Sequence, residues 1–375
     1  MTAPQEILIS AGEASGDMYA AQLARALQTR TGAHLFGMGG PKMREAGVEI
    51  VADASEIAVV GITEVLRRLP AVWRAWRKLE REAVRRKPAL GITVDSPGFN
   101  FGLARRLKRH GIRMAYFISP QIWAWRPRRM RWIQRRFERV LVIFPFEEEI
   151  YRKAGVAVNF VGHPLVDSVH PQMTREQFAA RFGLDAKRPI VALLPGSRPS
   201  EIRRSMPIIA DACVRLQENI PVQFVLVVAS GLNADIFDSY NRPDLRITPV
   251  SGAVYDALAA ADCAIVSSGT ATVEAALLGA PMVVVYRLSG LTATIARRLV
   301  RTPLFAMVNV ISGRQVVPEL IQDRFTAEAL EREVRRLLDS PEARAQQKRD
   351  LGEIRLKLGP GGAIERAAEI IAGML

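Results

Sequence analysis

The chain has 375 residues, a length that indicates two domains at the usual size of about 150 residues each. Apolar residues make up 49% of the chain and charged residues 24%, which is typical of a globular protein and excludes a disordered one. The formal net charge is +14, with 52 Lys and Arg against 38 Asp and Glu, which is unusual, and the position of the charge is more informative than its total.

Residues 67–139 carry the whole surplus of positive charge. This stretch contains 21 Lys and Arg against 4 Asp and Glu, whereas the rest of the chain contains 31 against 34. All five Trp residues lie in the same stretch. Such a mixture is typical of a surface that meets nucleic acid, anionic lipid or a phosphorylated substrate, although a solvated charged face has the same composition.

The two cysteines, Cys213 and Cys263, lie in apolar surroundings and fit neither a disulfide framework nor a zinc-ligand spacing. We expect buried thiols in a reducing compartment. The apolar run at residues 7–9 is too short for a signal peptide, and no uncharged apolar run reaches the roughly 18 residues of a membrane-spanning helix. These features predict a cytoplasmic protein with at most a surface attachment to a membrane.

Short apolar runs alternate with helical patterns along the chain, as in strands buried on both faces of a parallel sheet. In the first half, strands are expected at residues 7–10, 34–36, 90–94, 114–118, 140–144 and 158–161, with a helix at 18–30. The alternation restarts with strands at 190–194, 224–229, 263–266 and 282–285, and with helices at 199–217 and 363–374. The pattern predicts an α/β fold of two doubly wound, Rossmann-like units.

The join between the two units is expected near residues 167–171, where the apolar periodicity is lost and a proline occurs. We therefore predict a first domain over residues 1–167 and a second over 168–345. Helical patterns fill the last 50 residues, so residues 346–375 form a separate C-terminal helical segment in this prediction.

Three polar segments follow strands of the first half, where ligands of open α/β sheets bind. Glu13, Ser15 and Gly16 lie where a helix follows the first strand, in a segment that does not match the dinucleotide fingerprint. A glycine-rich turn spans residues 37–43 and could line the same cleft. Asp95 begins a segment that ends at Asn100. A carboxylate at the end of a strand can serve as a general base, but an Asp at this position is also common as a helix N-cap or in a turn.

Two turns of the second half have the form of phosphate sites, in which backbone N–H groups at the start of a helix face an anion. Neither is a Walker A motif, because the terminal Gly-Lys-Ser/Thr is missing. The carboxylate of Glu274, one helical turn beyond the second site, could accept hydrogen bonds from two ribose hydroxyls. The residues of the two turns are Gly196, Ser197 and Arg198, and Ser268, Gly269 and Thr270.

An amphipathic helical pattern lies in the basic, Trp-rich stretch. Leu66, Leu69, Trp73 and Trp76 fall at near-helical spacing, while Arg side chains lie off that stripe. A helix with Trp on one face and Arg on the other suits a membrane interface, and a helix packed on the core has the same pattern. The four histidines have no metal-ligand spacing, so no metal is expected.

Taken together, these segments resemble the lipid-A-disaccharide synthases, bacterial inverting glycosyltransferases of family 19. The resemblance runs nearly end to end and departs from the usual D-A-P-D-F-N at Ser96 and Gly98. The segments that carry it include ISAGEASGD (up to 17), GMGGPKM (37–43), VVGITEVL (59–66), DSPGFN (95–100), SPQIWAWRPRRM (119–130), FPFEEEIY (144–151), FVGHPLVD (160–167), LLPGSRPSEI (193–202), SSGTATVEAALLGAPMVVVY (267–286) and VNVISGRQVVPELIQ (308–322).

The resemblance implies a GT-B fold, with two Rossmann-like domains facing a cleft and residues 346–375 crossing back to the first domain. It implies the condensation of UDP-2,3-diacylglucosamine with 2,3-diacylglucosamine 1-phosphate to a β-1,6-linked disaccharide 1-phosphate and UDP, without metal or cofactor. The expected location is the inner face of the cytoplasmic membrane, with its anionic surface as a partner. A homodimer is one possible assembly, and no nucleic acid is expected.

The resemblance also implies roles for the segments. Asp95 is the expected base and Glu13 its alternative, while the two turns with Arg198 stabilise the leaving pyrophosphate and Glu274 binds ribose. Further residues expected in the cleft are Ser15, Gly16, Asn100, Asn309 and Gln322. Two other interpretations stay open: a different lipid-linked GT-B sugar transferase, and a basic nucleic-acid-binding protein, although no nucleic-acid-binding signature supports the latter.

Overall fold

The chain forms two compact units in a computed structural model that describes residues 5–56, 62–120, 129–229, 231–240, 242–288 and 304–375, with no side-chain description for 62–68. Unit 1 consists of residues 1–164 and 358–375, and unit 2 of residues 165–357. Helix α16 (Pro341–Lys357) packs on helices of unit 2, and Gln347 accepts a hydrogen bond from the N–H of Met282 there. The crossing back to unit 1 therefore begins at Leu358, not at residue 346 as predicted.

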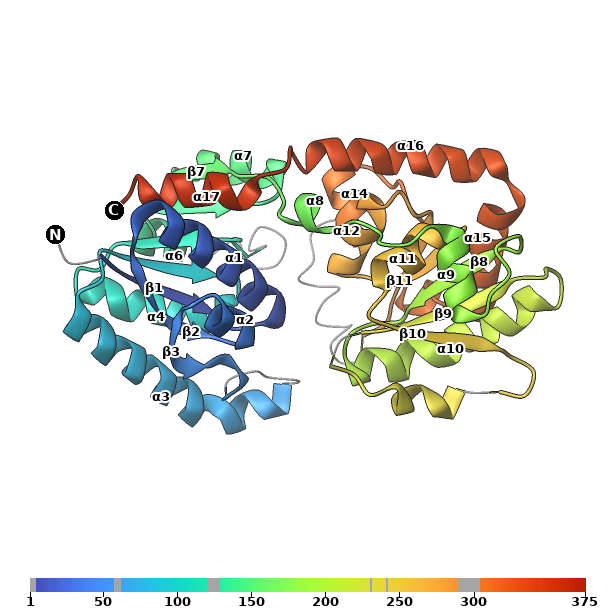
Figure 1. Cartoon of the computed structure of the whole chain (residues 1–375), viewed down its shortest axis with the longest axis horizontal. Helices are drawn as coiled ribbons and strands as arrows, with labels where there is room; N and C mark the ends of the chain where they lie inside the picture. The colour runs from blue at the N-terminus through green and yellow to red at the C-terminus, as the bar shows by residue number, and fades with distance from the viewer. Residues whose placement is uncertain (1–4, 57–61, 121–128, 230, 241, 289–303) are drawn as a thin grey trace. The chain divides into compact units, whose positions relative to one another are not determined.

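Unit 1 is built on a seven-stranded sheet in the order β3-β2-β1-β4-β5-β6-β7, in which every neighbouring pair is parallel (Figure 1). The chain reverses its direction of winding between β1 and β4, so a ligand crevice is expected at the carboxyl ends of these two strands. The strands are β1 (Glu6–Ala11), β2 (His34–Gly39), β3 (Glu49–Asp53), β4 (Leu90–Val94), β5 (Met114–Phe117), β6 (Arg139–Val142) and β7 (Val158–Phe160).

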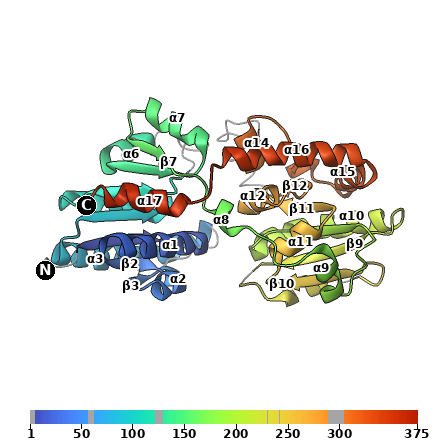
Figure 2. The same cartoon turned by 45° about the horizontal axis from the view of Figure 1, so that its top comes forward.

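Helices cover both faces of this sheet (Figure 2). Side chains of α3, α4 and α6 share one apolar cluster with β1, β2, β5 and β6, whereas α1 and α17 pack against each other. The helices are α1 (Ala14–Thr31), α2 (Pro41–Glu45), α3 (Ile62–Arg86), α4 (Pro97–Arg109), α6 (Met130–Arg136), α7 (Pro145–Lys153) and α17 (Ala363–Ala372).

Unit 2 repeats the architecture with a six-stranded parallel sheet in the order β10-β9-β8-β11-β12-β13, so its winding reverses between β8 and β11. One apolar cluster joins α10 and α15 to this sheet. The strands are β8 (Ile190–Leu194), β9 (Gln223–Val228), β10 (Ile247–Ser251), β11 (Cys263–Ser267), β12 (Met282–Tyr286) and β13 (Glu319–Ile321). The remaining helices are α8 (Leu165–Ser168), α9 (Arg175–Phe182), α10 (Pro199–Gln217), α11 (Val254–Ala260), α12 (Thr270–Leu277), α14 (Met307–Ser312) and α15 (Ala327–Asp339).

The prediction of two doubly wound α/β units is confirmed. The predicted buried thiols are confirmed as well, since Cys213 and Cys263 are free and fully buried, and burial raises the pKa of both. Strands β3, β10 and β13 were absent from the prediction. All three are edge strands, and β13 has only three residues, so their apolar runs are too short or too polar to stand out in the sequence.

The two segments of unit 1 that lead to and from unit 2 are tied to each other. The backbone N–H of His163 donates to the carbonyl of Leu358 at 2.9 Å. The guanidinium of Arg366 on α17 donates to the carbonyl of Val161 from Nε at 2.9 Å and from Nη2 at 2.6 Å. Gly162 is required here, because it has a φ of 84° and a Cβ would lie 2.7 Å from the Arg366 guanidinium.

Candidate active site

The predicted motifs of unit 1 lie at its switch point. Ala11, the last residue of β1, is in register with Val94, the last residue of β4, so the segments that follow these strands are neighbours. Glu13 is the N-cap residue of α1 on one side, and Asp95 lies on the other. Ser15 is exposed in the first turn of α1, whereas Gly16 is buried, with the space for its Cβ 3.8 Å from the Cβ of Asp95.

Asp95 and Ser96 both have a left-handed backbone, each with a φ of 46°. This conformation is costly for residues other than glycine and is concentrated at functional sites. The Asp95 carbonyl accepts two hydrogen bonds, from Asn100 Nδ2 at 2.7 Å and from the hydroxyl of Tyr116 at 2.8 Å. The strained turn between β4 and α4 is therefore held by side chains from its own helix and from the neighbouring strand β5.

Ser96 joins the two loops of the switch point. Its hydroxyl accepts a hydrogen bond from the backbone N–H of Gly12 at 3.2 Å, and a Cβ on Gly12 would lie 2.8 Å from that oxygen. Gly98, the second departure from the usual family sequence, has open space around the position of a Cβ. Ser96 therefore forms a contact between the two loops, whereas the glycine at position 98 leaves the packing unchanged.

The environment of Asp95 raises its pKa to about 6. Burial of the carboxylate is the main cause, the negative charge of Glu13 adds to it, and a hydrogen bond from the backbone N–H of Ser96 opposes it. Glu13 itself is exposed to solvent. A carboxylate with a pKa near 6 is ionised at neutral pH and basic enough to take a proton, which fits Asp95 better than Glu13 for the role of base.

The glycine-rich turn at residues 37–43 is held by Asp17, a residue of α1. The Asp17 carboxylate accepts hydrogen bonds from the backbone N–H groups of Gly40 at 2.7 Å, Lys42 at 2.9 Å and Met43 at 3.2 Å. These are the N–H groups that a phosphate would use at this helix start. We conclude that the turn is occupied by the protein's own carboxylate, which supports a structural role for it.

The two predicted turns of unit 2 also lie at a switch point. Leu194 at the end of β8 is in register with Val266 near the end of β11, so the turns that follow are neighbours. Gly196 has a φ of 135°, a backbone that favours glycine. Arg198 is the N-cap residue of α10 and is more than half exposed, and Gly269 precedes Thr270 at the start of α12. The arrangement brings two helix N-termini and one cation together, as an anion site requires.

The first turn already holds a carboxylate. Glu201, in the first turn of α10, accepts a hydrogen bond from the N–H of Ser197 at 3.1 Å and pairs with the Arg198 guanidinium at 3.3 Å. Its side chain lies against Gly196, since a Cβ there would be 2.7 Å from Glu201 Cβ. Tyr286, the last residue of β12, lies close enough for the charges of Glu201 and Arg198 to affect the pKa of its hydroxyl. The end of β12 therefore lies near this pair.

Glu274 lies on α12, one turn after Thr270. Burial raises the pKa of its carboxyl group, and the hydroxyl of Tyr255 donates to Oε1 at 3.3 Å, which lowers that pKa. A buried carboxylate with one weak donor is stabilised by further donors, and ribose hydroxyls would supply them. This environment supports the predicted role of Glu274.

Asn309 and Gln322 differ in their surroundings. The side chain of Asn309 is fully buried and uses its whole amide inside unit 2, donating to Val317 and Glu319 and accepting from the N–H groups of Val316 and Val317. Asn309 therefore anchors α14 to β13 and has no free group for a direct substrate contact. Gln322 follows β13 with a left-handed φ of 55°, and its buried Nε2 has no partner in the described residues, which leaves a donor available.

The helix predicted to meet a membrane is α3. Its apolar stripe has two parts in the structure, one exposed to solvent and one packed on the core. Leu69 is 52% exposed and Trp73 45% exposed, with the Arg77 guanidinium 3.6 Å from the centre of the Trp73 ring. Trp76 packs against the core of unit 1 and donates from its indole to the carbonyl of Phe99 at 3.2 Å. The side chain of Leu66 lies outside the described residues, as do Trp123 and Trp125.

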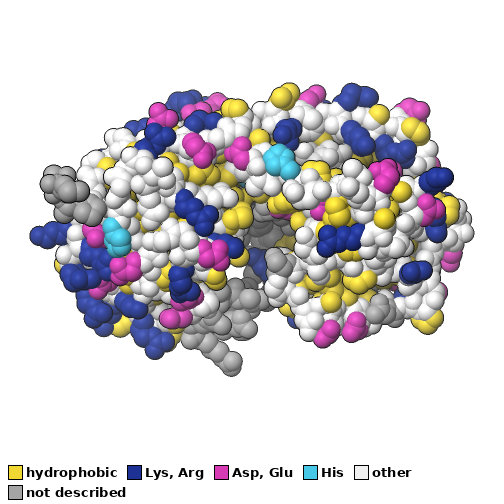
Figure 3. Space-filling model, viewed as in Figure 1, with side chains coloured by type: hydrophobic (Ala, Val, Ile, Leu, Met, Phe, Trp, Pro, Cys, Tyr) yellow, Lys and Arg dark blue, Asp and Glu magenta, His cyan; other side chains and the backbone are white. Residues whose placement is uncertain are grey.

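Basic side chains gather along the rim of unit 1 formed by α3 (Figure 3). The exposed Lys and Arg residues of α3 from Trp73 onward include Arg74, Arg77, Lys78 and Arg81. Trp132 on α6 is 40% exposed and lies between two guanidinium groups, those of Arg129 at 5.3 Å and Arg136 at 4.9 Å. Aromatic rings flanked by cations are typical of a membrane interface.

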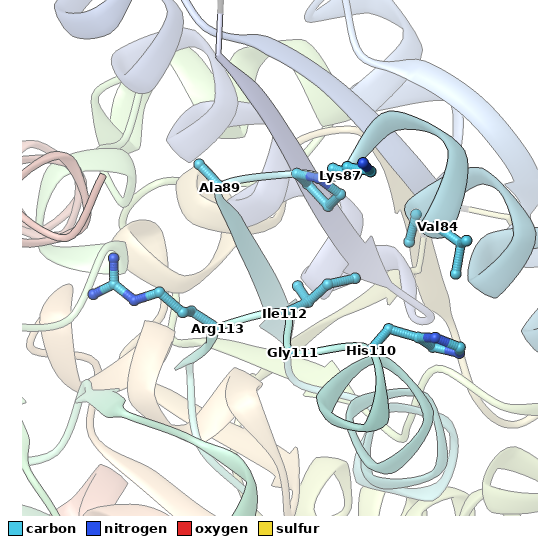
Figure 4. Close-up of a pocket in the computed structure, with 9 residues that line it drawn as sticks. Val84, Lys87, Ala89, His110, Gly111, Ile112 and Arg113 are labelled. Carbon is cyan, nitrogen blue, oxygen red and sulfur yellow. The ribbon is translucent and has the colours of Figure 1, made fainter.

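A pocket of about 380 Å³ lies at the amino-terminal end of the sheet of unit 1, among Lys87, Ala89, His110 and Arg113 (Figure 4). These residues precede β4 and β5, so the pocket is at the amino ends of the strands, away from Asp95. Arg113 and His110 point away from one another in Figure 4 and pair with Glu138 and Glu80. The pocket therefore adds nothing to the switch-point site.

Among the described residues, no cluster of three or more His, Cys, Asp or Glu side chains is placed to hold a metal ion. Within the same residues, no helix combines the length and the apolar character needed to cross a membrane.

Sequence reasoning missed two residues of the sites, Tyr116 and Glu201. Tyr116 belongs to an apolar strand run, where its hydroxyl is a weak signal of a buried partner. Glu201 lies three residues after Arg198 within the first turn of a helix, where an acidic residue is common for electrostatic reasons alone. Only the tertiary structure shows what each of them contacts.

Comparison of the sequence with known families gives one consistent result. A profile of the family described as "Lipid-A-disaccharide synthetase" matches residues 7–371. The chain is 45% identical over 372 residues to a lipid-A-disaccharide synthase of Geobacter sulfurreducens, covering 98% of this chain and 97% of the relative. It is 43% identical over 379 residues to that of Myxococcus xanthus, covering 100% and 99%.

Solved structures with low sequence identity share the fold. The calicheamicin glycosyltransferase CalG4 matches with a TM-score of 0.63 at 16% identity, covering 100% of this chain and 99% of that one. MurG of Acinetobacter baumannii matches with a TM-score of 0.57 at 16% identity, covering 99% and 100%. A UDP-GlcNAc 2-epimerase of Neisseria meningitidis, bound to UDP-GlcNAc, matches with a TM-score of 0.69 at 11% identity. The match covers 98% of this chain and 100% of that one. The predicted GT-B fold is confirmed by these likenesses.

Proposed function

The chain belongs to the lipid-A-disaccharide synthase family, and from this we propose that it joins UDP-2,3-diacylglucosamine to 2,3-diacylglucosamine 1-phosphate. The 6-hydroxyl of the acceptor attacks the anomeric carbon of the donor sugar from the face opposite UDP. The new C1–O6 bond forms as the bond between C1 and the UDP oxygen breaks, and the configuration inverts to β. The observation that carries the proposal for this chain is the Asp95 carboxylate at the switch point of unit 1, with its raised pKa.

Asp95 takes the proton of the acceptor hydroxyl in this scheme. Its pKa of about 6 keeps it ionised at neutral pH, and its neighbour Glu13 disfavours a second negative charge nearby. Proton transfer to Asp95 therefore relieves a repulsion within the site. Glu13 is the alternative base, and Ser15 and Gly16 line the same switch point on the side of α1.

The switch point of unit 2 receives the nucleotide. The N–H groups of the turns at Gly196–Ser197 and Ser268–Thr270 and the guanidinium of Arg198 stabilise the charge that grows on the leaving diphosphate. Glu274 accepts hydrogen bonds from the ribose hydroxyls. The exposed guanidinium of Arg198 and the partly satisfied carboxylate of Glu274 support these assignments.

The exposed Leu69 and Trp73 and the basic residues around them dock on the anionic inner surface of the cytoplasmic membrane, where acylated sugars reside. Trp76 supports this face from beneath, because its ring is anchored in unit 1. A homodimer stays a prediction from the sequence.

The direct test is incubation of the protein with both acylated glucosamine substrates in detergent, with release of UDP and mass analysis of the lipid product as readouts. We expect UDP release that depends on both substrates and a disaccharide 1-phosphate as product. Release of UDP with a different acceptor, or none with these two, would contradict the proposal. Competition by other UDP-sugars distinguishes another lipid-linked sugar transferase.

A further inference from the structure

The orientation of Asp95 is set through its backbone. Asp95 follows β4 and, with Ser96, makes two consecutive left-handed residues, neither of which is glycine. Such a backbone persists only where surrounding groups hold it. The N–H of Asp95 donates to the carbonyl of Phe117 at 3.2 Å, and its carboxylate accepts from the N–H of Ser96, so backbone groups hold the residue on two sides.

The carbonyl of Asp95 is the third point of attachment. Tyr116 Oη donates to it at 2.8 Å and Asn100 Nδ2 at 2.7 Å, and both of these side chains have no exposed surface. The Tyr116 ring is fixed in turn, since it packs against Phe101 at 5.9 Å and Phe137 at 4.8 Å between ring centres. The hydroxyl is therefore presented to the carbonyl by a rigid aromatic group.

Asn100 connects the same carbonyl to β1. Its Oδ1 accepts from the hydroxyl of Ser10 at 2.8 Å, and its Nδ2 also lies 3.1 Å from the carbonyl of Val94. With its amide used in this way and its side chain fully buried, Asn100 is better placed to hold the turn than to contact substrate.

We infer that Tyr116, supported by Asn100, is a positioning residue that holds the left-handed turn at Asp95 and Ser96, and so directs the Asp95 carboxylate toward the acceptor hydroxyl. The inference rests on the proposed role of Asp95 as the base. Loss of the Tyr116 hydroxyl lets the turn relax toward ordinary backbone, which moves the carboxylate from its buried position toward water.

The test compares Tyr116→Phe with Tyr151→Phe, in the full chain, by UDP release from the two acylated substrates. Both changes remove a buried phenol hydroxyl, and that of Tyr151 contacts Ser119 and Pro120 instead of Asp95. For Tyr116→Phe we expect kcat to fall about ten- to a hundredfold, with an unchanged KM for the UDP-sugar. The acid limb of its pH–rate profile should move to lower pH, because a more hydrated carboxylate has a lower pKa.

Equal turnover of the two Phe variants, or a loss without a shift of the acid limb, would overturn the inference. If Tyr116→Phe folds poorly, the addition of Ser96→Gly is informative, because glycine adopts the left-handed backbone without strain. We expect the double variant to regain thermal stability and to recover kcat and the acid limb toward the native values, because the turn then holds Asp95 without the phenol hydroxyl. A double variant that regains stability but keeps the low kcat of Tyr116→Phe would overturn the inference.

Asp95→Asn separates this inference from the proposed function. An inactive Asp95→Asn with a normal Tyr116→Phe would contradict the inference alone. Normal turnover of Asp95→Asn would contradict the role of Asp95 as base, and with it the need to position this residue.

Discussion

The Glu201 carboxylate occupies the turn that precedes α10, where it accepts a hydrogen bond from the N–H of Ser197 at 3.1 Å. It also pairs with Arg198 at 3.3 Å, so one side chain uses both the amide and the cation proposed for the donor diphosphate. A diphosphate that binds there must displace this carboxylate. The competition between Glu201 and the nucleotide gives the first prediction.

Glu201→Ala should bind UDP about threefold more tightly than the native chain, because an ion pair with a half-exposed guanidinium is worth about 1 kcal/mol or less and its loss frees Arg198. Isothermal calorimetry with UDP measures the change. Glu328→Ala is the matched control, since Glu328 pairs with Arg215 near the other end of the same helix. Weaker binding by Glu201→Ala would show that the carboxylate orients Arg198 for the nucleotide instead.

The second prediction concerns the pH dependence of turnover. With Asp95 as the base and a pKa of about 6, kcat/KM should rise with pH through 6 and reach a plateau above about 7. A profile recorded at saturating and limiting acceptor would show this limb. A flat profile, or an acid limb centred well away from pH 6, would contradict Asp95 as the base.

The third prediction follows from the same pKa by linkage. The folded state raises the pKa of Asp95 above the ordinary value of 3.8, so the folded protein binds more protons and loses stability as pH rises from about 4 to about 6. Asp95→Asn removes this penalty, which the rise of the pKa from 3.8 to about 6 places at about 3 kcal/mol above pH 6.

Asp95→Asn should therefore abolish UDP release and yet raise the melting temperature at pH 7.5, with little change at pH 4. Thermal unfolding at the two pH values measures the difference. A variant that is equally destabilised at both would indicate that the carboxylate makes a stabilising contact in the folded protein.

The fourth prediction separates two tryptophans of α3. Trp73→Ser should reduce binding to vesicles that contain anionic lipid and leave the melting temperature and UDP binding unchanged, because Trp73 is exposed. Trp76→Ser should lower the free energy of unfolding by roughly 2–4 kcal/mol, because its ring packs on the core. Sedimentation with vesicles and chemical denaturation distinguish the two effects, and equal behaviour would contradict the division of the stripe.

The fifth prediction uses two glycines of α4. A Cβ at Gly102 would lie 2.1 Å from the Trp76 ring, whereas a Cβ at Gly98 would meet open space. Gly102→Ala should therefore destabilise unit 1 by about 1–3 kcal/mol, and Gly98→Ala should be neutral or slightly stabilising. If denaturant unfolding showed the same cost for both, the packing of Trp76 against α4 would be wrong.

The sequence predicted the architecture well, because long buried strands and amphipathic helices have strong periodic patterns. The helix predicted at 199–217 is α10 within the same bounds, and the proposed phosphate turns lie beyond neighbouring strand ends. Both candidate loops of unit 1, at Glu13 and at Asp95, also follow adjacent strands. The rule that ligands bind beyond the carboxyl ends of strands therefore located both switch points.

Other features depend on contacts between distant residues, and no local pattern encodes them. Trp73 and Trp76 both belong to the predicted apolar stripe, but only Trp76 packs on the core, where its ring fills the space beside Gly102. Asp17 lies in the first turn of α1, but its carboxylate holds the start of α2. The left-handed turn at Asp95 needs the hydroxyl of Tyr116, which comes from the next strand along the sheet.

The hydrogen bonds from Arg366 to Val161 have a consequence for biosynthesis. Helix α17 completes unit 1 by packing on α1, and Arg366 secures the carbonyl of Val161, so the first unit includes residues 358–375. Although the strands of unit 1 leave the ribosome first, their sheet lacks one covering helix until the whole of unit 2 has been translated. Unit 2 is a continuous stretch of chain, so it can fold before unit 1 is complete, although its synthesis begins later.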